Sequence, residues 1–228
     1  MIIDLLNKIR SHYDQESFLD EDRVIWNFLE NLPRKNKLKV LEIGSGRGRF
    51  ALKMKNHFKF DITCLEINPN LAKLTENYGL KTIKSDFLKS KLPLNEYDII
   101  HSSHFIEHFK YPEISYVLDK MFSIVKPDGY VIIRSPLFHR NFYLDIDHFR
   151  PYPPETILNY MRNAQQQSVG NFQIEEVVRW YRRPPVQITQ HTDRLLVQII
   201  NSLLLVLWTK NKIFSSKADG YVSIFKKI

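Results

Sequence analysis

The sequence contains a single cysteine, Cys64, among 228 residues. One cysteine cannot form an internal disulfide framework, and such scarcity is typical of proteins in reducing compartments. Because Cys64 lies in the apolar run DITCLEI, we expect it to be a small buried hydrophobe and not a reactive thiol. The cysteine content therefore favours a cytoplasmic protein and excludes a disulfide-stapled fold.

Signals for membrane insertion or secretion are also scarce. The first residues carry acids early and lack the basic start and long apolar stretch of a signal peptide. The most apolar run, residues 195–208, is shorter than the ~20 residues that cross a bilayer. Gln198, Asn201 and Ser202 interrupt it. We expect no transmembrane helix.

Positive charge is in excess, with 33 Lys and Arg against 25 Asp and Glu, a net charge of +8 and a pI near 9.4. This balance permits a nucleic acid, an anionic membrane surface or a phosphorylated acceptor as partner. The sequence contains no RNA-binding module, and SSHF stands where an N-P-P-Y-like base-methylation motif would be. Nucleic acid is therefore not the expected partner.

The periodicity of apolar residues changes along the chain. Residues 1–33 have helical spacing and predict an N-terminal helical cap, which would cover a ligand cleft as a lid. Residues 34–228 predict the main domain, with a helical insert at about 184–214.

Strand-like segments occur at 38–44, 61–67, 80–86, 96–103, 130–136, 172–183 and 220–228. Helical segments alternate with the first five of them. One begins at Pro69, with Asn68 as a possible cap and Gly79 as a stop, and another covers 111–126 before a turn signal at Pro127–Gly129. The alternation indicates a doubly wound α/β fold. We expect a mostly parallel seven-stranded sheet, an antiparallel last strand and helices on both faces.

The segment VLEIGSGRGRF, residues 40–50, is a glycine-rich turn between a strand and a helix. A dinucleotide fingerprint would need a third glycine at position 49, which is Arg49, and no G-K-[ST] follows for a P-loop. Glu42 precedes the first glycine by two residues. Its carboxylate would repel a pyrophosphate and attract an ammonium group or another cation. The turn therefore predicts a ligand that carries positive charge.

Two further acids end neighbouring strands. Glu66 ends the second strand, near the ~20-residue offset at which an acid binds ribose hydroxyls. Asp86 ends the third strand, where it could accept a hydrogen bond from an adenine amine. Ligands of open α/β sheets bind at these carboxyl ends of the strands. The acids therefore predict an adenosine-containing ligand.

Five segments in order, VLEIGSGRGRF, CLEIN, KSDFL, YDIIHSSHFIEHF and VKPDGYVIIRSP, resemble class I S-adenosylmethionine-dependent methyltransferases of type 11/23. The resemblance covers about residues 38–180. It implies a Rossmann-like fold and S-adenosylmethionine as cofactor, with the methionine end at the glycine turn, the ribose at Glu66 and the adenine at Asp86. The cofactor-binding residues that we carry over are Glu42, Gly44, Ser45, Gly46, Glu66, Ile67, Asp86, Phe87, Ser103 and His104. Asp128 stands where the family usually has glycine, and a turn tolerates this change.

The segment FYLDIDHFRPYPPETI, residues 142–157, resembles a loop of methyltransferases that act in polysaccharide and lipid-linked glycan biosynthesis, with Pro153 in place of the usual small hydroxylic residue. A hydroxyl acceptor needs a general base. We expect His148 to be that base, with Asp145 or Asp147 orienting it. Arg150, Tyr152 and His108 are the expected acceptor-binding residues.

Other interpretations of these residues stay open. His148 and Arg150 could simply tie the loop to the following helix. His101, His104 and His108, near the end of the fourth strand, are further candidate bases. For His104 we expect a structural role or a cofactor contact in preference to catalysis. No metal is expected, because the spacing of Asp145, Asp147 and His148 is not a recognised metal signature. A divalent ion on those three residues is the alternative.

The sequence thus predicts a methyltransferase whose acceptor is a hydroxyl of a sugar, glycan or glycolipid intermediate. The alternatives are a small metabolite such as a quinone precursor or a carboxylate, an RNA, and a cofactor-binding subunit without catalysis. Leu196, Ile199 and Leu203 form an apolar stripe on the 195–208 helix, with basic residues on both sides. The stripe could pack on the sheet edge, form a homodimer, or contact the inner surface of the membrane from the cytoplasm.

Overall fold

The computed structural model describes residue 8 and residues 20–33, 37–162, 170–188 and 194–228. Two units divide the chain. The helical unit comprises Met1–Leu32 and Trp180–Gly220, and the sheet unit comprises Pro33–Arg179 and Tyr221–Ile228. The expected N-terminal cap and the expected insert at 184–214 thus belong almost entirely to one unit. The lid role of the cap stays a prediction, and most of its residues lie outside the described part of the chain.

A seven-stranded sheet forms the centre of the sheet unit, in the order β3-β2-β1-β4-β5-β7-β6. The strands are β1 (Lys39–Ile43), β2 (Asp61–Glu66), β3 (Lys81–Lys84), β4 (Tyr97–Ser103), β5 (Val125–Pro136), β6 (Ile174–Arg182) and β7 (Gly220–Lys227). The first five strands pair in parallel, and the last strands are antiparallel. The predicted fold class is confirmed. Because the first five strands run in parallel, all their carboxyl ends lie at one edge of the sheet.

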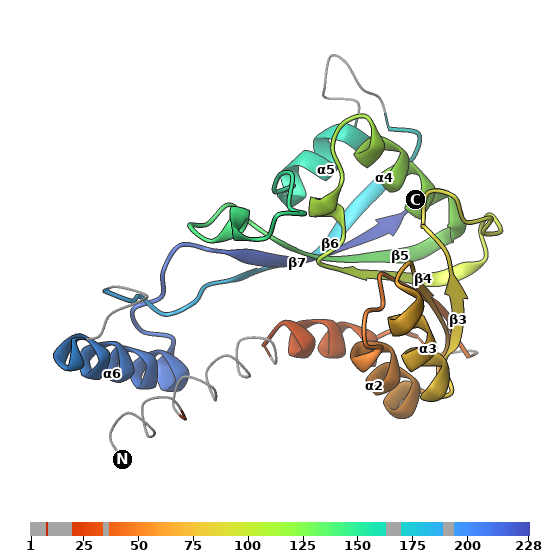
Figure 1. Cartoon of the computed structure of the whole chain (residues 1–228). Coiled ribbons are helices and arrows are strands. Elements are labelled where there is room, and N and C mark those ends of the chain that lie inside the picture. Colours follow the sequence, from red (N-terminus) through yellow and green to blue (C-terminus); the bar gives the residue numbers. More distant parts are fainter. Residues whose placement is uncertain (1–7, 9–19, 34–36, 163–169, 189–193) are drawn as a thin grey trace. The chain divides into compact units, whose positions relative to one another are not determined.

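Helices flank both faces of this sheet. They are α2 (Arg49–Phe58), α3 (Pro69–Asn77), α4 (Glu113–Ile124) and α5 (Pro154–Met161). Figure 1 shows α2 and α3 against one face and α4 and α5 against the other. The strands between the two layers bury Val, Leu and Ile side chains almost completely, as strands covered on both faces do.

Helix α3 begins where the sequence places its signals. The side chain of Asn68 accepts hydrogen bonds from the backbone N–H groups of Asn70 and Leu71, and Pro69 occupies the first helical position. Gly79 follows the helix with a φ of +71°, a conformation that glycine adopts at little cost. The predicted cap and stop are therefore confirmed.

Strand β5 differs from the prediction. The expected helix over 111–126 ends at Ile124, and β5 begins at Val125 and continues through the Pro127–Gly129 turn signal. The pairing of β4 with β5 shifts register between Tyr97 and Ile99, and Asp128 has a φ of +61°. The turn residues thus form an irregularity within a strand and not a separate turn.

Cys64 is fully buried in β2, as predicted. Burial, followed by the nearby negative charge of Glu42, raises the pKa of its thiol to about 12. The thiol is therefore protonated and unreactive in the native state.

The helical unit contains a helix at residues 20–30, α6 (Leu195–Asn211) and the strand ends nearest them. Trp208 and Leu205 are the buried side chains of α6. A cavity of about 380 Å³ lies within this unit, and Trp180, Tyr181, Arg182 and Trp208 are among its lining residues. Across the described ranges, no helix is long and apolar enough to cross a bilayer.

Candidate cofactor and acceptor site

The glycine turn connects β1 with α2 at the carboxyl edge of the sheet. Backbone N–H groups of Gly44 and Ser45 donate to the carbonyl of Leu65, at 2.9 and 3.3 Å, so the turn is held against the end of β2. Gly44, Gly46 and Gly48 all have positive φ, between +54° and +68°. Side chains other than glycine rarely adopt this conformation, and this explains the alternating glycines.

The three glycines have different surroundings. A Cβ at Gly48 would lie 2.7 Å from the Thr75 methyl group, and one at Gly44 would lie 3.2 Å from the Phe105 ring. A Cβ at Gly46 would meet no atom within 4 Å. Packing therefore accounts for Gly44 and Gly48, while open space lies over Gly46 for a ligand to occupy.

Glu66 links the glycine turn to the start of α3. Its Oε2 accepts a hydrogen bond from the Gly46 N–H at 2.7 Å, and its Oε1 accepts one from the Asn68 N–H at 2.9 Å. The residue is only 5 % exposed. Each carboxylate oxygen has a second lone pair. A ribose hydroxyl could donate to these lone pairs without breaking either backbone hydrogen bond.

The adenine end follows β3. The Asp86 carboxylate accepts a hydrogen bond from the Leu88 N–H at 2.9 Å and is half-buried. Phe87 is buried, in a T-shaped contact with Phe105, and the Lys120 ammonium lies 5.0 Å from its ring centre. Ile67 is 67 % exposed. An adenine contact therefore suits Ile67 better than Phe87, and both assignments stay predictions.

Glu42 is buried with two other polar side chains under the site. It pairs in register with His101 on β4, and its carboxylate lies 3.6 Å from His101 Nδ1. The His101 ring stacks on Phe50 at 4.2 Å, and the Arg134 guanidinium lies 4.4 Å from the centre of the same phenyl ring. Burial and the charge of Arg134 hold the pKa of His101 well below 6.5.

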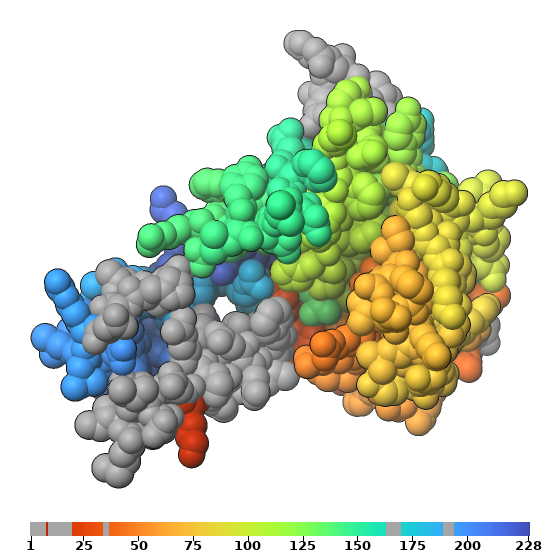
Figure 2. Space-filling view, in the orientation of Figure 1, coloured from red at the N-terminus to blue at the C-terminus, as the bar shows by residue number. Residues whose placement is uncertain are grey.

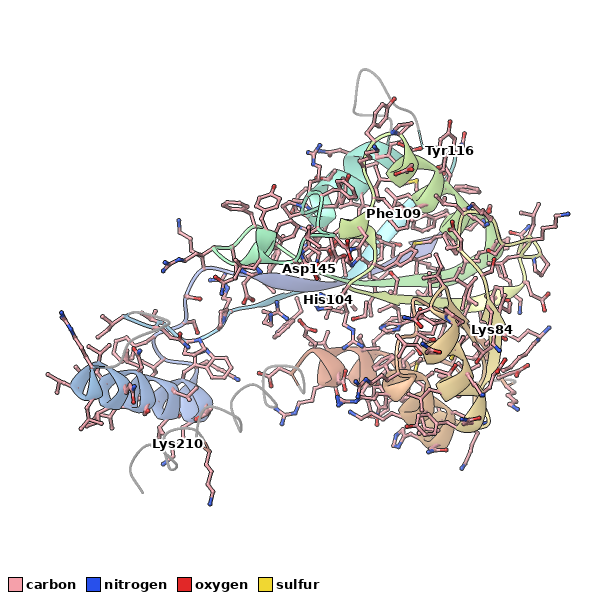
Figure 3. The ribbon with its side chains drawn as sticks, viewed as in Figure 1. Lys84, His104, Phe109, Tyr116, Asp145 and Lys210 are labelled. Carbon is pink, nitrogen blue, oxygen red and sulfur yellow. The ribbon has the colours of Figure 1, made fainter. Side chains whose placement is uncertain are left out.

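His101 was among the candidate bases near the fourth strand. That expectation is wrong, because the residue lies inside β4 and is fully buried. It is a structural histidine, neutral at physiological pH. Ser103 is the last residue of β4, and the exposed His104 follows with a φ of +51° (Figure 3).

The loop between β5 and α5, residues 137–153, is tied to a 3-10 turn, η1 (Ile106–His108), that follows β4. The Phe149 N–H donates to the Glu107 carbonyl at 2.9 Å, and the Tyr152 hydroxyl donates to the Phe109 carbonyl at 2.8 Å. In the space-filling view the green and teal surface of this loop continues into that of α5 (Figure 2). The loop therefore has a defined position beside η1.

Two imidazoles meet at this junction. The rings of His108 and His148 have their centres 5.0 Å apart. His108 Nδ1 lies 3.1 Å from the Asp147 carbonyl oxygen, and His148 Nδ1 lies 2.9 Å from the Phe142 carbonyl oxygen. A carbonyl oxygen can only accept, so each Nδ1 carries the proton. In the neutral ring, each Nε2 is then left with its lone pair.

The His148 ring contacts both the backbone and a carboxylate. Asp145 or Asp147 was expected to orient it, and the Phe142 carbonyl holds Nδ1 at 2.9 Å. Asp145 Oδ2 lies 3.6 Å from Nε2, the nitrogen that would act as base, and Asp147 contacts a ring only through its backbone carbonyl. The orienting role of Asp145 or Asp147 stays a prediction, and the contact from the Phe142 carbonyl could not be read from the spacing of acids.

Arg150 and Tyr152 occupy different environments. Tyr152 is 4 % exposed, and its backbone carbonyl accepts a hydrogen bond from the Tyr221 hydroxyl at 2.6 Å. This arrangement suits anchoring of the loop better than binding of an acceptor. Arg150 is exposed, with its guanidinium 5.4 Å from the centre of the Tyr152 ring.

Comparisons with known proteins agree with this geometry. Residues 16–169 match a family described as a methyltransferase domain. The chain belongs to this family. Its fold resembles that of an S-adenosylmethionine-dependent methyltransferase from Archaeoglobus fulgidus, with 24 % identity, a TM-score of 0.62, and 92 % of this chain and 94 % of that one covered.

Other methyltransferases show a more partial likeness. The phosphoethanolamine N-methyltransferase 2 of Haemonchus contortus, solved with S-adenosylmethionine, has a TM-score of 0.55 and 14 % identity over 86 % of this chain and 50 % of its own. An rRNA adenine N-6-methyltransferase of Limosilactobacillus reuteri is 28 % identical over 88 residues, 36 % of each protein's length. The family and the fold support S-adenosylmethionine as the cofactor of this methyltransferase.

The residues of this methyltransferase fit that cofactor. The open space over Gly46 can take its amino-acid end, while the Glu66 carboxylate offers lone pairs for ribose hydroxyls. Glu42 is 4 % exposed and lies beside His101. Its cofactor contact stays a prediction.

Glu107, which precedes His108, was expected to line the cleft, but no particular contact was assigned to it from the sequence. It is completely buried, and its Oε2 accepts a hydrogen bond from the Ser135 hydroxyl at 3.1 Å. His104 Nδ1 lies 3.3 Å from its Oε1. Complete burial of an acid beside histidines would have indicated a site residue. That burial could not be read from the sequence, because it depends on the loop that packs over η1.

Proposed function

We propose that this methyltransferase transfers a methyl group to a hydroxyl of a sugar or glycan intermediate. The observation that carries the proposal is the pair His108 and His148, whose Nδ1 protons are held by backbone carbonyls. A hydroxyl acceptor must lose a proton as it is methylated, whereas a carboxylate acceptor needs no base. Two imidazoles, one from η1 and one from the loop tied to it, favour the hydroxyl.

Each part of the site has a role in this proposal. When bound, S-adenosylmethionine would supply a methyl group on a positively charged sulfur. An acceptor oxygen can bond to the methyl carbon as the carbon–sulfur bond breaks and its electrons pass to sulfur. His148 Nε2 accepts the hydroxyl proton, and the Phe142 carbonyl keeps the ring in the tautomer that can do so. Arg150 is exposed beside the loop and can bind an acidic or phosphorylated group of the acceptor.

The test is methyl transfer from radiolabelled S-adenosylmethionine to a panel of acceptors. The panel contains nucleotide sugars, lipid-linked saccharides, a quinone precursor and ribosomal RNA. We expect label in a saccharide, and His148→Gln to lower the rate by about 10²–10⁴-fold. Calorimetry with S-adenosylhomocysteine provides the control, because the variant should bind it as the wild type does.

Several outcomes would contradict the proposal. Label in RNA would favour the class of the L. reuteri relative, and label in the quinone precursor would favour a small-metabolite enzyme. Binding of S-adenosylhomocysteine without transfer to any member of the panel would indicate a non-catalytic subunit.

We further propose that α6 brings the enzyme to an anionic membrane surface, where a glycolipid acceptor would lie. Leu196 and Leu203 are 69 % and 59 % exposed, a large apolar surface for a helix. Basic residues surround the helix in the sequence, namely Arg183, Arg194, Lys210, Lys212 and Lys217. An apolar face bordered by Lys and Arg is typical of helices that lie at the membrane interface.

Sedimentation with liposomes tests this surface. We expect binding to vesicles that contain phosphatidylglycerol, weaker binding to neutral vesicles, and loss of binding in a Leu196→Ser/Leu203→Ser variant. A stable dimer in solution that the same variant dissociates would show instead that α6 is a subunit interface.

A further inference from the structure

Glu107, His108 and His148 come from η1 and from the loop after β5, and they converge at one place. Each offers one ligand atom, and these three atoms lie within 4.8 Å of one another. We propose that they bind a divalent transition-metal ion. The inference rests on the proposed acceptor site, because the same histidines belong to it.

The hydrogen bonds of both histidines suit metal binding. Histidine ligands of metals usually donate their other N–H to a backbone carbonyl or a carboxylate, which fixes the ring and its tautomer. Here the Asp147 and Phe142 carbonyls accept from Nδ1 of His108 and His148, at 3.1 and 2.9 Å. Each ring therefore has its second coordination shell already formed.

The burial of Glu107 provides an independent reason. The residue is 0 % exposed, and its Oε1 accepts no hydrogen bond from the described residues, although His104 Nδ1 lies 3.3 Å away. A buried carboxylate is costly unless a charge or a full set of hydrogen bonds compensates it. A cation between Oε1 and the two imidazoles would supply that charge.

The exposed carboxylate of Asp145 adds to the attraction for a cation. Its Oδ2 lies 3.6 Å from His148 Nε2, so it is close enough to become a fourth ligand or to bind a coordinated water. The proposed ligand set differs from the alternative drawn from sequence, Asp145, Asp147 and His148. The principal carboxylate comes from η1, and Asp147 contributes its backbone carbonyl to orient His108.

Two imidazoles and one carboxylate suit Zn²⁺, Mn²⁺ or Fe²⁺ and leave positions open for acceptor oxygens. A cation there would lower the pKa of a bound hydroxyl. His148 would then act as a ligand and not as the base of the metal-free mechanism. Binding of two neighbouring hydroxyls would give selectivity for a diol.

The test is titration of the full chain with Mn²⁺ alone and with Zn²⁺ alone, after treatment with a chelator. We expect one ion per chain. Glu107→Gln, His108→Gln and His148→Gln should each weaken binding by at least the roughly 10–100-fold that loss of a second-shell partner costs. His57→Gln is the matched control, because His57 is exposed on α2 and lies outside the cluster, and it should bind as the wild type does.

A second measurement on the wild type avoids any folding defect of the Glu107 variant. Mn²⁺ should broaden the imidazole NMR signals of His108 and His148 at lower ion concentration and more strongly than those of His57. No binding of either ion at millimolar concentration, or affinity unchanged in all three variants, overturns the inference.

The outcomes separate this inference from the proposed function. Methylation of a saccharide that persists at full rate in chelator, by protein that binds no ion, overturns the metal site and leaves the proposed function standing. Ion binding that the three variants abolish, without methylation of any saccharide, supports the site and overturns the acceptor.

Discussion

At the scale of single residues, the three glycines of the turn are required for different reasons. All three need positive φ, but only Gly46 has open space where a side chain would project. The same substitution should therefore have different consequences at neighbouring positions. Comparing them separates the role of the turn in folding from its role in binding.

We expect Gly46→Ala to cost about 1–2 kcal/mol of folding free energy, the strain of an L-residue at positive φ. It should also weaken S-adenosylhomocysteine binding about tenfold, a change of ~1.4 kcal/mol, because the methyl group occupies the open space. Gly48→Ala should destabilise by a further ~1–3 kcal/mol, because its Cβ would meet Thr75 at 2.7 Å. Urea denaturation and calorimetry measure the two effects. If the Gly46→Ala and Gly48→Ala variants lost affinity in the same proportion to their loss of stability, the binding role of Gly46 would be contradicted.

His101 makes stability depend on pH. Its native pKa is held well below 6.5, first by burial and then by Arg134, and the carboxylate of Glu42 faces the same ring. The unfolded chain binds a proton at this position as pH falls below 6.5, while the native chain does not. The stabilisation is therefore complete above pH 6.5 and is lost as pH falls below it, by up to about 1.4 kcal/mol per pH unit.

The test compares unfolding free energies at pH 7 and pH 5 in the wild type and in His101→Phe, which keeps an aromatic ring against Phe50. We expect a shallower pH dependence in the variant, by about one proton. Equal slopes in both proteins would show that His101 does not cause the effect, since seven other histidines remain among the eight of the sequence.

At the scale of secondary structure elements, the start of α3 joins fold and cofactor site. The Asn68 side chain caps the helix, while its backbone N–H donates to Glu66 Oε1. Asn68→Ala should remove only the cap, at a cost of ~1 kcal/mol. Affinity for S-adenosylhomocysteine should be unchanged, because the backbone contact persists. Asn68→Asp is the control that keeps a cap, and a large loss of affinity in the alanine variant alone would contradict this division of roles.

The sequence was sufficient for the elements whose signals are local. Pro69 after Asn68, the glycine turn and the apolar strand runs all act within a few residues, and the structure has them where they were expected. The Pro127–Gly129 signal misled because β4 holds those residues in the sheet, a contact that no local pattern contains.

The site shows the same limit. Glu66 could be predicted because strand ends meet at one edge of a parallel sheet. The carbonyls that orient His108 and His148, and the burial of Glu107, could not be, because they arise only when residues about 40 positions apart meet, as His108 and Asp147 do.

At the scale of the whole molecule, the division into two units separates the predicted cofactor residues from α6. Residues 42–104 lie in the sheet unit, whereas α6 lies in the helical unit. The chain passes from one unit to the other along β6 and β7. Arg182 at the end of β6 forms an ion pair with Asp219, and the Arg182 carbonyl accepts a hydrogen bond from the Asp219 N–H. The segment beyond this pair should therefore be removable.

We expect a variant in which Asn-Gly replaces residues 184–217 to fold and to bind S-adenosylhomocysteine as the wild type does, since Asn-Gly favours a two-residue hairpin turn. It should lose liposome binding, because α6 is absent. Calorimetry and vesicle sedimentation check the two results. Loss of cofactor binding in a folded variant would show that the helical unit contributes to the site.

The Cys64 thiol can report how often the centre of the sheet opens. The thiol is the chain's only one, lies within β2 beside β1, and has a pKa of about 12. A chromogenic thiol reagent can therefore react only when β2 separates from its neighbours. The rate of colour development would measure how often this central part of the sheet opens, and it should slow when S-adenosylhomocysteine binds. Ligands of the site could thus be ranked by how much they slow the reaction of the Cys64 thiol, without an engineered residue.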